Sequence, residues 1–264
     1  MPIPAKKRLG QHFLHDPNIL GRIADALEIQ PGDTVLEIGP GPGGLTGHLY
    51  RRATRLVAIE KDHDLIPGLR SRYPRLELAE GDALDLDWHA LTGAGPVRIT
   101  GNIPYNITSP LIELALAPPR PVVIVFLVQK EVAERVAAAH GGAEYGALSV
   151  GVQAVAKVER LFTIPAGAFQ PRPKVDSAVL RLRPLAEPLV PPEQTAGFRR
   201  FVVGLFGFRR KQLVRGLREL SGLPAAEVEA WLAGVEIAPE TRPQELSPAI
   251  FARLYAARPA GADR

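Results

Sequence analysis

The stretch VLEIGPGPGGLT, Val35 to Thr46, joins a β-rich run to a glycine-rich turn and a helix-like start. Gly39, Gly41 and Gly44 have the spacing G-x-G-x-x-G, and Glu60 follows about 20 residues later, as in dinucleotide folds. A strand, a glycine turn and a helix in this order predict the first unit of a parallel α/β sheet. On these residues alone, an NAD-dependent enzyme is one interpretation.

A carboxylate two residues before the first glycine favours another ligand. A pyrophosphate is held by free amides and positive potential at a helix start, and Glu37 repels it. S-adenosylmethionine carries a sulfonium and an ammonium but no phosphate. Glu60 ends the second β-rich run, where it can accept from both ribose hydroxyls, and Asp82 follows the third, where it can accept from the adenine amino group. Each acid alone also suits a helix N-cap or first turn, but together they predict one cofactor site.

β-rich and helical stretches alternate from Pro31 to Leu185, which predicts an α/β, Rossmann-like, mostly parallel sheet with helices on both faces. The predicted strands are DTVLEI, RLVAIE, RLELAE, PVRIT and VVIVFLV, and the predicted helices span 44–52, 62–73 and 108–116. ALSVGVQAVAKVERLF and KVDSAVLRLRP follow without an obvious helix between them and predict a closing antiparallel pair.

Prolines cluster in PLAEPLVPPEQ, which indicates a linker. We therefore expect residues 1–185 to form a cofactor-binding catalytic domain with an N-terminal arm. Residues 186–264 are expected to form a small all-α domain, with helical periodicity over 195–220 and around 225–232 and 248–256.

Positive charge gathers in this C-terminal part, although the net charge is only +4. Clustered cations attract nucleic-acid phosphates, and a solvated helix face has the same composition. The predicted RNA-binding residues are Arg199, Arg200, Arg209, Arg210, Lys211 and Arg215, together with Lys6, Lys7 and Arg8 near the N-terminus.

The composition excludes several classes of protein. The chain has no cysteine, which removes disulfides, thiolate metal ligands and cysteine nucleophiles, and its six histidines form no recognisable ligand set. We expect no metal site. No uncharged apolar run approaches the roughly 20 residues of a membrane span, and the N-terminus lacks the apolar core of a secretory signal. The expectation is a soluble, cytoplasmic protein without a membrane partner, and a monomer.

A second loop, NIPYNITSP from Asn102 to Pro110, follows the apolar run VRITG. The adenine N6 amine is a poor nucleophile because its lone pair is delocalised into the ring, and acceptors aimed at its N–H groups favour a pyramidal nitrogen. The Asn102 side-chain carbonyl and the Ile103 backbone carbonyl can be these acceptors, with Pro104 restricting the backbone. Tyr105 offers a ring face for the base. The loop predicts amine methylation; its alternative is a turn with a core tyrosine.

Five segments together resemble the family of ribosomal RNA adenine N6,N6-dimethyltransferases: RLGQHFL, VLEIGPGPGGLT, GDAL, GNIPYNIT and FQPRPKVDSAVLRL. The resemblance covers residues 7–183 and continues more loosely beyond. It implies a methyltransferase sheet with a reversed final strand and S-adenosylmethionine as cofactor. The family most often has Asn where this chain has His12, and both side chains form hydrogen bonds. The implied and motif-based cofactor contacts are His12, Leu14, Glu37, Gly39, Gly41, Glu60, Asp82, Ala83 and Asn102.

Two residues of the last segment also receive roles from the resemblance. Phe169 is implied to cover the second face of a flipped adenine, and its alternative is a core phenylalanine before a proline-rich turn. Lys174 is implied to contact phosphate, and a surface lysine is its alternative.

The implied reaction is dimethylation at N6 of two adjacent adenosines in the 3′-terminal hairpin loop of small-subunit (16S) ribosomal RNA, with the small subunit or its precursor as partner and a contribution to ribosome assembly. Loops with splayed bases are what sequence-specific RNA recognition favours. The alternatives are a large-subunit (23S) rRNA methyltransferase that confers macrolide resistance, a non-catalytic RNA- or DNA-binding factor on the same fold, and, more distantly, a dehydrogenase. PRPKVDSAVLRL and the C-terminal domain resemble the small-subunit enzyme more than the large-subunit one, and the presence of both Asn102 and Tyr105 favours catalysis.

Overall fold

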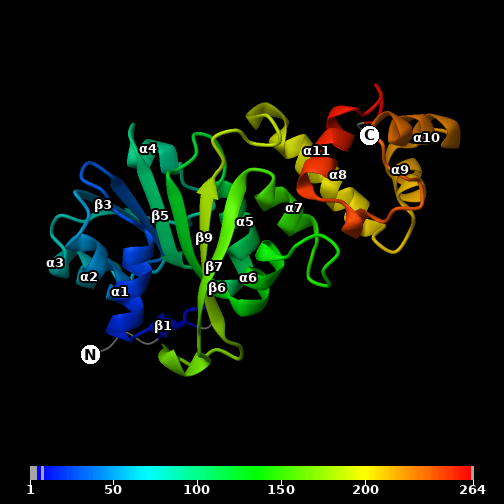
Figure 1. Cartoon of the computed structure of the whole chain (residues 1–264). Helices are drawn as coiled ribbons and strands as arrows, with labels where there is room; N and C mark the ends of the chain where they lie inside the picture. Colours follow the sequence, from blue (N-terminus) through cyan, green and yellow to red (C-terminus); the bar gives the residue numbers. More distant parts are fainter. Residues whose placement is uncertain (1–4, 7–8, 263–264) are drawn as a thin grey trace. The chain divides into compact units, whose positions relative to one another are not determined.

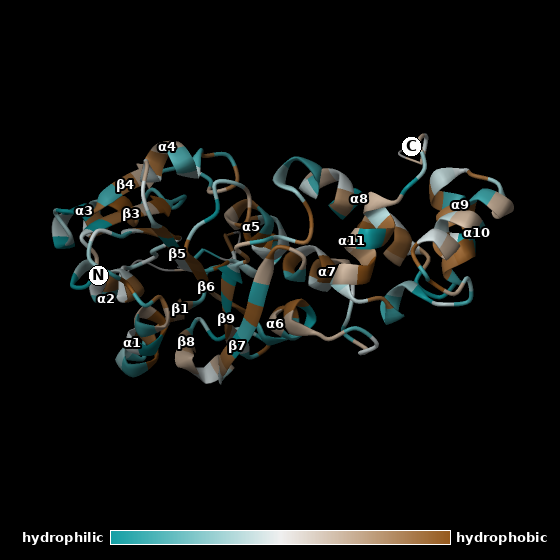
Figure 2. Cartoon of the chain, turned by 45° about the horizontal axis from the view of Figure 1, so that its top comes forward, coloured by the Kyte–Doolittle hydropathy of each residue, from teal (hydrophilic) through white to brown (hydrophobic). Residues whose placement is uncertain are grey.

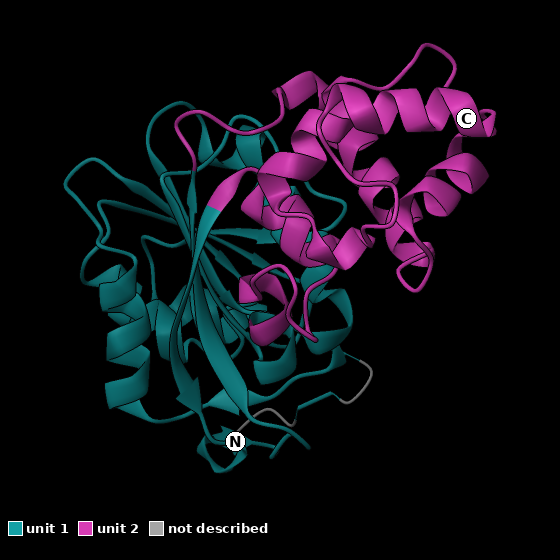
Figure 3. Ribbon diagram, turned by 45° about the vertical axis from the view of Figure 1, so that its right-hand side comes forward, with its two compact units in different colours: residues 1–133, 157–184 teal, residues 134–156, 185–264 magenta. Residues whose placement is uncertain are grey.

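The structure is a computed structural model that describes residues 5–6 and 9–262. Contacts between residues divide the chain into two compact units (Figure 3). The first unit comprises Met1–Ala133 and Lys157–Pro184, and the second comprises Glu134–Ala156 and Leu185–Arg264.

A seven-stranded sheet forms the centre of the first unit (Figure 1). Its strands are β2 (Thr34–Ile38), β3 (Arg55–Glu60), β4 (Glu77–Glu80), β5 (Val97–Asn102), β6 (Val123–Gln129), β7 (Ala156–Ile164) and β9 (Ser177–Pro184). They lie in the order β4-β3-β2-β5-β6-β9-β7. β4, β3, β2, β5 and β6 pair in parallel, and β9 runs antiparallel to β6. The predicted Rossmann-like sheet with a reversed final strand is confirmed.

Successive side chains of a strand point to opposite faces of the sheet. β2 and β6 are buried along almost their whole length, so both faces of the sheet are covered, and helices pack on each. Val35 belongs to a core cluster with residues of α1 (Pro17–Ala26), α2 (Gly44–Tyr50) and α3 (Ile66–Arg72). Leu36, on the other face, lines one hollow together with Trp88 of α4 (Trp88–Thr92) and Leu114 of α5 (Thr108–Ala115). Hydropathy colouring shows the apolar residues along the central strands (Figure 2). A sheet buried in this way positions its strand ends firmly.

A second, two-stranded sheet anchors the N-terminal segment. β1 (Phe13–Leu14) pairs antiparallel with β8 (Phe169–Gln170), so that Phe13 lies opposite Gln170 and Leu14 opposite Phe169. This pairing fixes the chain just after residues 9–12.

The second unit is built from helices around an aromatic core. Phe198, Phe201 and Tyr255 are buried and in ring contact, and the Trp231 indole donates to the Leu254 carbonyl at 2.9 Å. The helices are α7 (Ala147–Gln153), α8 (Thr195–Gly207), α9 (Leu213–Ser221), α10 (Ala225–Gly234) and α11 (Pro248–Ala256).

Two segments differ from the prediction. The helical periodicity over 195–220 is interrupted by a turn, where the Lys211 amide donates to the Phe208 carbonyl at 2.8 Å. Residues 147–153, expected within a β-rich segment, form α7. There the Ser149 hydroxyl accepts from the Gly146 amide at 3.0 Å and donates to the Arg135 carbonyl at 2.5 Å. Capping and tertiary contacts outweigh the β-branched residues of this stretch.

Candidate functional site

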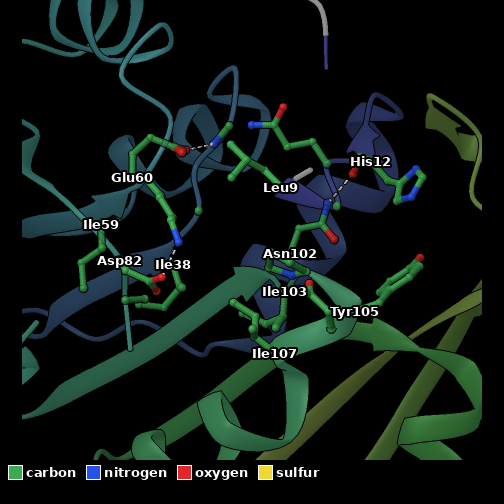
Figure 4. A pocket seen from close by; sticks show the side chains of 18 of the residues that line it. Leu9, His12, Ile38, Ile59, Glu60, Asp82, Asn102, Ile103, Tyr105 and Ile107 are labelled. Atoms are coloured by element: carbon green, nitrogen blue, oxygen red, sulfur yellow. Dashed lines mark hydrogen bonds and ion pairs between the residues drawn. The ribbon is translucent and has the colours of Figure 1, made fainter. Parts of the chain in front are cut away.

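A pocket lies at the edge of the first unit where β2, β3, β4 and β5 end (Figure 4). The carboxyl ends of parallel strands meet at one edge, which is where open α/β sheets bind ligands. Residues 9–13 supply a further wall. The pocket brings together ten of the predicted site residues: His12, Gly39, Gly41, Glu60, Asp82, Ala83, Asn102, Ile103, Pro104 and Tyr105. Leu14 and Glu37 line an adjoining hollow that shares Gly39, Gly41 and Asn102.

The glycine turn after β2 makes close approaches that a side chain would block. Gly41 has φ +58°, and a Cβ there would lie 3.0 Å from the Phe13 ring. Its amide donates to Glu60 Oε2 at 3.0 Å. The turn therefore needs glycine both for its backbone conformation and for contact with the N-terminal segment.

Glu60, at the end of β3, is held by backbone amides. Oε1 accepts from the Asp62 amide at 2.7 Å, while Oε2 accepts from Gly41. Burial raises the pKa of Glu60, and these N–H donors oppose the rise. The carboxylate is thus fixed in the pocket wall, and its remaining lone pairs can accept from a ligand.

Glu37 is a buried acid with one carboxyl oxygen, Oε2, that has no hydrogen-bond partner among the described residues. The residue is 1% exposed, and within the described part of the chain neither its Oε2 nor the buried Thr46 hydroxyl has a partner. Burial raises the pKa of Glu37 to about 8. A buried acid in this state is stabilised by a ligand that brings positive charge or N–H donors. The residues present therefore fit S-adenosylmethionine, which carries both.

Asp82, after β4, keeps its charge in the pocket wall. Its Oδ2 pairs with Lys61 Nζ at 2.5 Å, and its Oδ1 accepts from the Leu84 amide at 3.0 Å. The Lys61 ammonium and this amide lower the pKa of Asp82. An ionised carboxylate at this position can accept from an exocyclic amine.

Asn102 ends β5 with a fixed side chain. Its Nδ2 donates to the His12 carbonyl at 2.6 Å, as Figure 4 shows, so its Oδ1 is the end of the carboxamide that remains to accept from a ligand. The next residue is also held, because the Ile103 amide donates to the Leu127 carbonyl at 3.0 Å.

Tyr105 follows in a short 3-10 helix, Tyr105–Ile107. Its hydroxyl lies 2.8 Å from the Ser177 hydroxyl, and its ring stacks on the His12 imidazole with centroids 5.7 Å apart. His12 Nδ1 lies 2.7 Å from the Pro171 carbonyl oxygen. His12 thus contacts the site through both its backbone and its ring.

Phe169 lies apart from these residues. It is 4% exposed, belongs to the core cluster of the first unit and lines neither hollow. Its stacking on adenine stays a prediction, and it requires the side chain to leave the core.

Most of the predicted RNA-binding residues are exposed. Lys174 is exposed in the first unit, and Arg199, Arg200, Arg209, Arg210, Lys211 and Arg215 are exposed in the second. Lys6 is instead bound to Asp62 and Asp64. Lys7 and Arg8 lie outside the described residues.

Some residues with contacts in the site were not identified from the sequence. Gln11 and Lys61 line the pocket, Asp62 holds the Glu60 carboxylate, and Ser177 contacts Tyr105. Gln11 lies inside RLGQHFL and Asp62 two residues beyond Glu60, but no local pattern indicates their partners. In the described ranges, no helix is long and apolar enough to cross a membrane, and no group of three His, Asp or Glu residues is placed to hold a metal.

Comparison with known proteins adds independent findings. The sequence model of the family described as ribosomal RNA adenine dimethylase matches residues 4–257. "Ribosomal RNA small subunit methyltransferase A" of Acidithiobacillus ferrooxidans is 45% identical over 254 residues, covering 95% of this chain and 93% of the relative. A dimethyladenosine transferase from Plasmodium falciparum is similar in structure, with TM-score 0.79, 29% identity and coverage of 92% and 96% of the two chains. The 23S rRNA methyltransferase ErmE is similar with TM-score 0.72, 29% identity and coverage of 93% and 98%.

Proposed function

Because the chain belongs to the ribosomal RNA adenine dimethylase family, we propose that it dimethylates N6 of two adjacent adenosines in the 3′-terminal hairpin loop of small-subunit (16S) rRNA. The protein is an rRNA methyltransferase. The observation that carries the proposed chemistry is the Asn102 carboxamide, fixed through its nitrogen at the rim of a pocket lined by acidic side chains.

Three acids are proposed to hold the cofactor. When bound, S-adenosylmethionine supplies a methyl group on a positively charged sulfur. The buried Glu37 carboxyl group, whose Oε2 has no hydrogen-bond partner among the described residues, offers an acceptor for its cationic part. Glu60, fixed by two amides, offers lone pairs to ribose hydroxyls, and Asp82 offers an ionised acceptor to the adenine amine. Gly39 and Gly41 leave room beside them.

The acceptor amine is proposed to be activated by position rather than by a base. Asn102 Oδ1 accepts from the N6–H of the target adenine, and the Ile103 carbonyl is the second acceptor. Both favour a pyramidal nitrogen whose lone pair is free to attack. Tyr105, held by Ser177, provides the stacking surface. The N6 proton passes to water after transfer, so orientation supplies most of the rate.

The rRNA itself is proposed to be held by the exposed cations of the second unit together with Lys174. The substrate places the reaction in the cytoplasm during assembly of the small subunit, and we propose that the protein acts as a monomer.

Methyl transfer to isolated subunits tests this function. Small and large subunits that lack adenine dimethylation are incubated with tritiated S-adenosylmethionine, and the labelled nucleotides are mapped. The 45% identity with a small-subunit enzyme, against 29% with a 23S enzyme, favours label on two adjacent adenosines of the small subunit. Label confined to 23S rRNA would establish the alternative, and no label in either subunit would contradict the enzyme proposed here.

A further inference from the structure

The N-terminal segment is tied to the cofactor pocket through one buried carboxylate. Asp62 has a side chain with no exposed surface. Lys6 Nζ donates to its Oδ1, and Gln11 Nε2 donates to its Oδ2 at 2.8 Å. The two partners are also joined, because the Lys6 amide donates to Gln11 Oε1 at 2.7 Å.

Burial of this carboxylate makes its partners necessary. Burial alone would raise the pKa of Asp62, but the hydrogen bonds from Lys6, Gln11 and the Asp64 amide, which Asp64→Asn would keep, hold it below its usual value. An ionised carboxylate without partners is costly in a buried position. The hydrogen bonds from Lys6 and Gln11 to this buried carboxylate are therefore expected to be stronger than those of a solvent-exposed ion pair.

Asp62 also acts on the predicted ribose-binding acid. Its backbone amide donates to Glu60 Oε1 at 2.7 Å, and the other oxygen of Glu60 accepts from the Gly41 amide. The residue that binds the N-terminal segment with its side chain thus orients Glu60 with its backbone.

The network reaches Asn102 through the next residue along the chain. His12 follows Gln11, and its carbonyl accepts from Asn102 Nδ2 at 2.6 Å. The position of Gln11 sets the position of the His12 carbonyl. By accepting from Nδ2, that carbonyl leaves the Asn102 Oδ1 facing the pocket.

We propose that Asp62 is a positioning residue: by binding Lys6 and Gln11 it fixes residues 9–12 as a wall of the cofactor pocket and, through the His12 carbonyl, orients the Asn102 carboxamide. The inference rests on the proposed function and deepens it. It assigns Lys6 to the pocket network, not to the RNA surface.

Asp62→Asn tests the proposal because it keeps the shape of the side chain and removes its charge. Loss of charge-assisted hydrogen bonds is expected to weaken S-adenosylmethionine binding about tenfold, measured by calorimetry. Amide hydrogen exchange of residues 9–14 accelerates. At saturating cofactor, kcat also falls, since Asn102 loses its anchor. Lys6→Gln shifts all three quantities in the same direction, whereas Lys6→Arg, which retains a cation, stays close to wild type.

Asp64→Asn is the matched control. Asp64 also pairs with Lys6, at 2.5 Å, but its side chain is 63% exposed. An exposed pair contributes little, so the control is expected to bind cofactor within about twofold of wild type.

The possible outcomes separate this inference from the proposed function. Unchanged cofactor affinity and exchange in both Asp62→Asn and Lys6→Gln would overturn the positioning role while leaving rRNA methylation intact. A lower melting temperature with unchanged affinity and kcat would make Asp62 a purely structural residue and also overturn it. If the wild-type protein itself binds no S-adenosylmethionine, the proposed function fails as well.

Discussion

The proposed mechanism gives the two ends of the Asn102 carboxamide different partners. The nitrogen donates to the His12 carbonyl, and the oxygen is the acceptor that we propose for the substrate amine. Asn102→Ala removes both contacts, and we expect kcat to fall by ~100-fold or more, the range seen when one oriented catalytic hydrogen-bonding group is lost. RNA affinity, measured by filter binding, should change little.

Asn102→Asp separates the two contacts. Its carboxylate keeps an acceptor but cannot donate to His12, so we expect transfer between that of Asn102→Ala and that of wild type. Substantial transfer by Asn102→Ala would contradict the chemistry proposed for this loop.

We expect Glu37 to make the binding of S-adenosylmethionine depend on pH. With a pKa of about 8 in the free protein, this acid is mostly protonated at pH 7. A bound cation favours the ionised form, so binding releases a proton, and affinity rises as the pH rises from ~6 to ~7.5, by up to about tenfold per unit. Calorimetry in buffers of different ionisation enthalpy measures that proton.

Glu37→Gln removes the titrating group while keeping its size. This variant should bind the cofactor more weakly, release no proton from this position and lose the pH dependence. Wild-type affinity that stays flat over the same pH range would show that Glu37 does not meet the cationic part of the ligand.

Among the secondary-structure elements, β2 and β5 leave no room for a side chain at Gly101, beside the pocket. Gly101 pairs with Ile38, and a Cβ on Gly101 would lie 2.4 Å from the Ile38 carbonyl oxygen. Gly101→Ala forces the strands apart, and we expect it to lower the free energy of unfolding by ~2–4 kcal/mol and to weaken cofactor binding, because Asn102 follows directly. Urea denaturation and calorimetry measure the two effects.

Gly68→Ala, in α3, is the control for this substitution. A Cβ at Gly68 meets no atom within 4 Å, so alanine should leave stability unchanged or raise it by up to about 1 kcal/mol. Equal stability of the two variants would mean that β2 and β5 tolerate a side chain at Gly101.

Site residues at the ends of predicted strands can be identified from the sequence. Contacts between residues that are distant in the sequence cannot. Glu60, Asp82 and Asn102 each end or follow a β-rich run, so parallel pairing alone brings them to one edge. The Gln11–Asp62 hydrogen bond joins residues 51 positions apart, and no local pattern encodes that partner. Phe169 likewise pairs with Leu14, far away in the sequence, and is buried in the core cluster.

The candidate catalytic pocket and the main group of predicted RNA-binding cations lie in different units of the chain. The first contains the pocket, and the second exposes a group of cations that the pocket does not use. Arg209 and Arg210 lie in the turn between α8 and α9, where Lys211 lies 5.1 Å from the centroid of the Phe208 ring. Cations beside an exposed turn predict contact with the phosphate backbone rather than base recognition.

Arg209→Gln/Arg210→Gln should therefore weaken binding to small-subunit RNA without changing cofactor affinity. Each lost phosphate contact reduces the slope of log K against log salt by about 0.7–0.9, so the double variant should lower it by roughly 1.5. Arg51→Gln/Arg70→Gln, in the first unit, removes equal charge and should leave the slope nearly unchanged. Equal slopes for the two double variants would show that net charge, and not this turn, draws the RNA to the protein.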